Sequence, residues 1–72
     1  MKKFVYEVAG YEFSDVEAFG TAWKDAKAKA TELHAPIYRL VIKNEDIKQE
    51  VYTKAGCFLP VSLVMVKNVM IF

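Results

Sequence analysis

The sequence predicts an α+β fold in which one amphipathic helix packs on one face of an antiparallel sheet. Two hairpin patterns flank a helical pattern: alternating apolar segments surround turn residues near 9–10 and 44–46, and apolar residues spaced by three and four lie between them. The predicted order is strand, strand, helix, strand, strand, followed by one or two further C-terminal strands. Short hairpins beside a helix are typical of α+β proteins and not of parallel βαβ units.

The first hairpin is predicted from alternation around a glycine. Residues 3–9 place Phe4, Tyr6 and Val8 on one side of an extended segment. Gly10 tolerates a positive φ and therefore favours a turn, after which residues 11–13 resume the alternation.

The helix is predicted to begin at a capping box. Ser14 and Glu17 have the spacing at which each side chain can accept from the other residue's backbone N–H. Pro36 ends the helical pattern near His34. The apolar stripe expected to face the sheet consists of Val16, Phe19, Trp23, Ala26, Ala30 and Leu33.

The second hairpin and the tail follow the helix. Residues 37–43 alternate, residues 44–46 are polar, and residues 47–54 form a more polar strand. Residues 61–66 are rich in β-branched side chains and are predicted to be extended, with a strand or a short helix over 69–72. Strands, a helix or an exchanged segment all stay open for residues 61–72.

The two faces of the predicted sheet differ in character. The side of Phe4, Tyr6 and Val8 is expected to join Tyr38, Leu40 and Ile42 against the helix. The other side would then mix apolar and charged residues, which is too apolar for a simple solvated face. An apolar surface of this kind recruits other chains unless the tail or a second molecule covers it.

We therefore expect a structural or interaction module that binds protein and associates with itself, as a homodimer. The expected interaction surface consists of Val5, Ile37, Arg39, Val41, Lys43, Leu63, Met65, Met70 and Phe72.

Size and composition exclude several other functions. The 72 residues are expected to form one domain, and 54% of them are apolar, which argues against disorder. One cysteine, Cys57, and one histidine, His34, are too few for a structural zinc site. Cys57 lies in an apolar run and is expected to be a small buried hydrophobe, so we expect no catalytic, metal or cofactor site. No apolar run approaches the roughly 20 residues of a membrane span, which favours a soluble, cytoplasmic protein.

Nucleic-acid binding is the alternative function. Arg39, Lys43, Lys48 and Lys54 fall on two neighbouring predicted strands and could form a basic patch. Ten basic residues against nine acidic ones leave a formal charge of +1, and acidic residues interrupt this patch. The alternative therefore ranks below protein binding.

Four short strings, at 10–15, 22–26, 35–39 and 55–59, read GYEFSD, AWKDA, APIYR and AGCFL. Together they resemble the small proteins that prophages and mobile elements of gut and Gram-positive bacteria carry. The resemblance implies a non-enzymatic accessory protein that acts through contacts.

Overall fold

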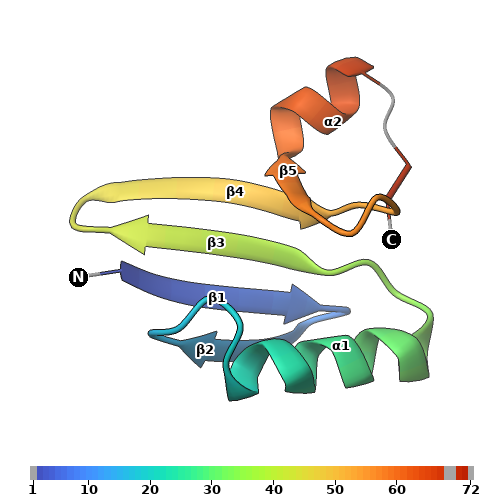
Figure 1. Ribbon diagram of the computed structural model, residues 1–72, viewed down its shortest axis with the longest axis horizontal. Helices are drawn as coiled ribbons and strands as arrows, with labels where there is room; N and C mark the ends of the chain where they lie inside the picture. The colour runs from blue at the N-terminus through green and yellow to red at the C-terminus, as the bar shows by residue number, and fades with distance from the viewer. Residues whose placement is uncertain (1, 68–69, 72) are drawn as a thin grey trace.

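The protein is an antiparallel sheet with a helix near each end of the strand order (Figure 1). The computed structural model describes residues 2–67, 70 and 71. Within them the sheet order is β2-β1-β3-β4-β5, with every neighbouring pair antiparallel. The elements are β1 (Lys2–Val8), β2 (Tyr11–Asp15), α1 (Thr21–Leu33), β3 (Tyr38–Lys43), β4 (Asp46–Tyr52), β5 (Phe58–Pro60) and α2 (Val61–Lys67).

The α+β class and the antiparallel sheet are confirmed, whereas the single helix is not. Both predicted hairpins form, because their turns have the required chemistry. Ala9 and Gly10 both have positive φ, 49° and 90°, as a two-residue type I′ turn requires. Asn44 has a φ of 56°, a conformation that asparagine tolerates better than most residues.

Helix α1 begins later than the capping box predicts. Ser14 pairs with Val5 inside the sheet, so it cannot cap a helix. The carboxylate of Asp15 instead accepts from the N–H groups of Val16, Glu17 and Ala22, at 2.8, 3.2 and 3.2 Å. Ala22 lies in the first turn of α1, so Asp15 caps the helix from the end of β2.

The N-cap of α1 is Gly20, and its lack of a side chain is a steric requirement. A Cβ at Gly20 would lie 2.6 Å from Oδ2 of Asp15. The backbone donors of Ala22, Glu17 and Val16 also hold the pKa of Asp15 below its ordinary value.

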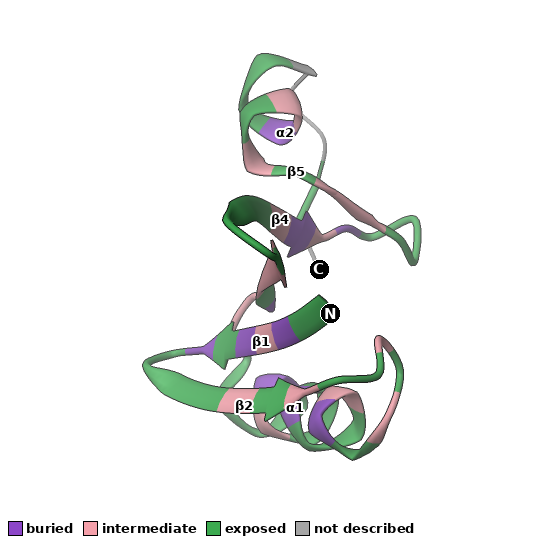
Figure 2. Cartoon of the chain, turned by 90° about the vertical axis from the view of Figure 1, so that its left-hand side faces the viewer, coloured by how far each residue is buried: buried purple, intermediate pink, exposed green. Residues whose placement is uncertain are grey.

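Helix α1 packs on β1 and β2 through alanines. Ala22, Ala26 and Ala30 are buried against Phe4, Tyr6, Val8 and Ile37, and this group forms the core. Buried stretches of β1 and α1 are purple in Figure 2. The predicted stripe is wrong at its ends: Val16 and Phe19 lie before the helix and are 65% and 64% exposed, and Leu33 is also exposed. Small side chains on the inner face let the helix backbone approach the sheet closely.

Trp23 extends the core toward β4 and β5. Its ring lies 4.9 Å from Tyr52, 5.3 Å from Phe58 and 5.5 Å from Tyr6, measured between ring centroids. Tilted and edge-on aromatic contacts of this kind are favourable beyond the area that they bury. The cluster therefore connects α1 to the half of the sheet that it does not cover directly.

Strand β3 presents the opposite face to the one predicted. Phe4 pairs with Val41 and Tyr6 with Arg39, so the odd-numbered residues of β3 face α1. Leu40, paired with Val5, and Ile42, paired with Lys3, lie on the other side. A shift of one residue in register exchanges the two faces of a strand completely.

The tail forms helix α2, one of the alternatives left open for residues 61–72, although its β-branched residues favour an extended segment. Pro60 ends β5 directly before the first helical residue, and proline favours the start of a helix. Val64 is buried, and α2 contacts β4 and β5. Beyond α2, Ile71 forms an isolated bridge with Thr53, and Met70 accepts from the N–H of Lys54. The predicted segment over 69–72 lies in part outside the described residues.

Candidate interaction surface

The residues expected to form one interaction surface are divided between the two faces of the sheet. Val5 lies on the face turned away from α1, which we call the reverse face. Ile37 is completely buried in the core beneath α1, and Val41 packs against the same core. Lys43 is exposed at the end of β3. The expected surface is therefore not continuous, because the predicted face of β3 is wrong.

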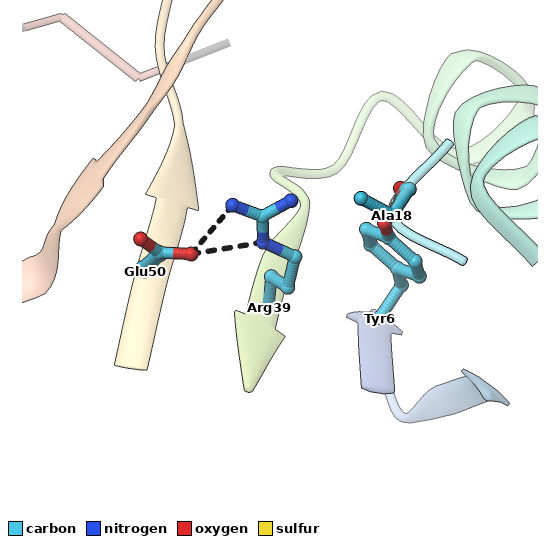
Figure 3. A network of polar contacts seen from close by, with 4 residues as sticks. All are labelled: Tyr6, Ala18, Arg39 and Glu50. Atoms are coloured by element: carbon cyan, nitrogen blue, oxygen red, sulfur yellow. Dashed lines mark hydrogen bonds and ion pairs between the residues drawn. The ribbon is translucent and has the colours of Figure 1, made fainter. Parts of the chain in front are cut away.

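Arg39 lies in a partly buried ion pair (Figure 3). Its Nε and Nη2 atoms donate to Oε1 of Glu50 at 2.9 and 2.6 Å. The guanidinium carbon lies 3.9 Å from the ring centroid of Phe58 and 5.4 Å from that of Phe4. The two charged side chains are only 12% and 19% exposed. Arg39 is therefore a cation of the core and not part of a basic surface.

Tyr6 is the polar neighbour of this pair. Its hydroxyl donates to the carbonyl oxygen of Ala18, which ties β1 to the loop before α1 (Figure 3). Burial raises the pKa of the Tyr6 phenol, and the Arg39 guanidinium offsets part of that rise.

The structure assembles a basic cluster that differs from the predicted one. Lys2 pairs with Lys43 across β1 and β3, and Val41 pairs with Lys48 across β3 and β4. These residues and Asp46 line a hollow of about 240 Å³. Of the predicted patch only two lysines take part, because Arg39 is paired and Lys54 lies in the turn after β4.

The reverse face carries a patch of apolar side chains. Cross-strand pairing places its members together: Val5 beside Leu40, and Ile42 beside Ile47. Ile47 is 63% exposed, Tyr38 is also exposed, and the other three are half-buried. We call this set the reverse-face patch; it consists of Val5, Tyr38, Leu40, Ile42 and Ile47.

A hollow of about 310 Å³ opens beside this patch. Val5, Leu40 and Tyr38 line it together with Val61, the first residue of α2, and with Glu7 and Gln49. Helix α2 therefore borders the patch without covering it.

Helix α2 adds exposed apolar side chains at that border. Met65 is 79% exposed, Val66 is exposed as well, and Met65 shares a second hollow with Ile47. Leu63 is half-buried, Met70 is exposed, and the predicted surface residue Phe72 lies outside the described residues.

His34 and Cys57, the one histidine and the one cysteine of the sequence, lie in different parts of the described fold. His34 ends α1 with a left-handed φ of 51°, whereas Cys57 lies in the turn between β4 and β5, and no hydrogen bond joins them. Cys57 is exposed, contrary to the prediction, and its carbonyl oxygen accepts from the buried hydroxyl of Thr53 at 2.9 Å. Across residues 2–67 and 70–71, no three His, Cys, Asp or Glu side chains gather closely enough to hold a metal ion.

One sequence signal could have identified the Arg39–Glu50 pair. Residues equally distant from a two-residue hairpin turn face each other, so Lys43 opposes Asp46 and Arg39 opposes Glu50 across the turn at Asn44. Opposite charges at such positions favour pairing on one face. The side of the sheet on which the pair lies does not follow from this count.

Neither of the described helices is long and apolar enough to cross a membrane. The resemblance to prophage-carried proteins stays a prediction. Comparison with models of protein families, with curated proteins and with solved structures finds no significant match for this chain.

Proposed function

We propose that this protein is a non-enzymatic interaction module that acts by protein–protein contact, including contact with itself. The observation that supports the proposal is the reverse-face patch, in which Ile47 is 63% exposed although it pairs with Ile42 within the sheet. Contiguous apolar surface of this kind marks interaction sites in soluble proteins.

The energetics favour covering the patch. Each square ångström of apolar surface removed from water stabilises the buried state by about 25 cal/mol. A domain of this size has a thin margin of stability on its own, so association is a common source of additional stability. The second apolar element, Met65 on α2, lies next to Ile47 and extends the surface available to a partner.

Sedimentation equilibrium of two matched variants tests the proposal. Ile47→Lys places a charge in the patch, whereas Phe19→Lys places the same charge at a residue of similar exposure, 64%, in the loop before α1. We expect Ile47→Lys to weaken self-association by about tenfold or more, as the loss of a central interface contact does, and Phe19→Lys to leave it unchanged. A wild-type chain that stays monomeric up to about 1 mM, where even weak specific complexes form, would contradict the proposal.

Binding to nucleic-acid phosphates is a second candidate, favoured by the cluster of Lys2, Lys43 and Lys48. Phosphate contacts give an affinity that falls steeply with salt. We expect Lys43→Gln with Lys48→Gln to reduce the salt dependence of RNA or DNA binding, and Lys24→Gln with Lys27→Gln on α1 to leave it unchanged. Binding that both pairs of substitutions weaken equally would indicate non-specific attraction only.

A further inference from the structure

We propose that a second copy of this chain covers the reverse-face patch, packed face to face about a two-fold axis that passes near Val5 and runs across the strands. This inference rests on the proposed function and specifies its partner and geometry. Two features support it: the charge pattern of β1 and the symmetry that this pattern permits.

The reverse face of β1 has a basic end and an acidic end. Lys3, Val5 and Glu7 are alternate residues of one strand, so they share that face, and Lys3 and Glu7 are both exposed. Glu12 pairs with Glu7 across β1 and β2 and increases the negative charge at the hairpin end. Val5 therefore lies midway between opposite charges.

The direction of the two-fold axis decides which charges meet. An axis that runs across the strands reverses the direction of the second β1, so that Lys3 of each copy faces Glu7 of the other. An axis along the strands would place Lys3 against Lys3 and Glu7 against Glu7. Two-fold interfaces use the same patch on both subunits, so a face that is complementary to itself after rotation fits this symmetry.

The strands that carry the patch lie side by side in one sheet (Figure 1). A standard interface would bury about 800 Å² on each copy. Sheets packed face to face lie about 10 Å apart, a distance that lysine and glutamate side chains bridge at the rim.

Charge reversal followed by mixing tests this geometry. Lys3→Glu brings the substituted acidic side chain against Glu7 of the other copy at both ends of the interface, and Glu7→Lys produces two lysine pairs in the same way. We expect each variant alone to associate about tenfold more weakly than the wild type, because two rim contacts become repulsive. In an equal mixture, each lysine of one variant again faces a glutamate of the other. Association should then return to within about twofold of the wild type.

Mixing distinguishes a disrupted interface from a folding defect, because a variant that folds poorly would not be rescued by the other variant. Lys24→Glu and Asp25→Lys on the exposed side of α1 change the net charge by the same amounts and serve as controls. They should neither weaken association alone nor strengthen it when mixed.

Each outcome has a distinct meaning. Restoration on mixing supports the two-fold arrangement across the strands. Variants that associate as the wild type does, or a mixture as weak as its components, would overturn that arrangement; if Ile47→Lys still weakens association, the proposed function stands without it. Absence of any wild-type association would overturn both.

Discussion

Asp15 and Gly20 determine where helix α1 begins, and they do so as a pair. The Asp15 carboxylate accepts from the N–H of Ala22 in the first helical turn, and Gly20 leaves the space that this carboxylate occupies. Ser14 and Glu17 have the spacing of a capping box, but Ser14 instead pairs with Val5 within the sheet. Strand pairing therefore prevents the capping box from forming, and this pairing cannot be predicted from a short stretch of the sequence.

Because Asp15 and Gly20 are so close, substitutions of the two residues should change the free energy of unfolding non-additively. Gly20→Ala should lower the free energy of unfolding by about 1–3 kcal/mol, the usual effect of inserting a methyl group into filled space. In a chain that already carries Asp15→Ala, the same substitution should have little effect, because the obstructing carboxylate is gone. Urea denaturation of the four chains measures the coupling; additive effects would mean that the Asp15 contact does not exist in solution.

Tyr6 predicts a dependence of stability on alkaline pH. Because burial raises its pKa in the folded state, the stability that it contributes is fully present below its unfolded pKa, about 10, and is lost as the pH rises through the higher folded pKa. Tyr6→Phe should be less stable at neutral pH by about 0.5–1.5 kcal/mol, since it lacks the bond to Ala18.

The difference in the free energy of unfolding between wild type and Tyr6→Phe should then shrink as the pH rises past the pKa of Tyr6 in the unfolded chain. Comparison of the two chains cancels the titration of the remaining tyrosines. A difference that stays constant over this range would show that Tyr6 is exposed to solvent.

At the scale of elements, the sequence predicts the hairpins well and the faces of the sheet poorly. Gly10 and Asn44 specify their turns locally, so both hairpins are confirmed. The register of β3 against β1 depends instead on the path of the chain through α1. Both faces of residues 37–42 carry at least two apolar side chains, so alternation alone does not say which side packs on the helix.

The tail shows a second limit of local reasoning. A run of β-branched residues favours extended structure, yet residues 61–67 are helical, with Val64 buried. Contact with β4 and β5 outweighs intrinsic propensity here. The exposed methionine that results, Met65, was predicted as a surface residue, and a helix was one of the alternatives left open for its segment.

The Arg39–Glu50 ion pair leads to a prediction that distinguishes a partly buried ion pair from an exposed one. Glu50→Gln should lower the free energy of unfolding by about 3 kcal/mol, because it leaves a partly buried guanidinium without its counter-charge. The matched change Glu32→Gln breaks the exposed ion pair with Lys29, in which the two charged atoms lie 3.0 Å apart. This change should lower the free energy of unfolding by less than about 0.5 kcal/mol.

Removal of both core charges provides the check. Arg39→Met combined with Glu50→Gln should recover part of the stability that Glu50→Gln loses, since no unpaired cation then stays among the rings of Phe4 and Phe58. Thermal or urea unfolding measures all four chains. Equal effects of the Glu50 and Glu32 substitutions would contradict the burial of the Arg39 pair.

At the scale of the whole molecule, the helices of the described residues, α1 and α2, leave part of the sheet uncovered. Helix α1 packs on one face of β1 and β2, whereas Val5, Leu40 and Ile42 lie on the reverse face, and α2 contacts β4 and β5. A sheet buried on one side normally has a polar second face. This second face combines an apolar centre with charges of opposite sign at the two ends of β1, which suits a second copy.

Isotope-filtered NOE spectroscopy on an equal mixture of labelled and unlabelled chains distinguishes a covered reverse face from a bare one. We expect intermolecular contacts from the methyl groups of Val5, Leu40 and Ile42, and none from Val16 in the loop before α1. Intermolecular contacts confined to Val16 and its neighbours, or none from the reverse face at concentrations where the chain is dimeric, would contradict the proposed dimer.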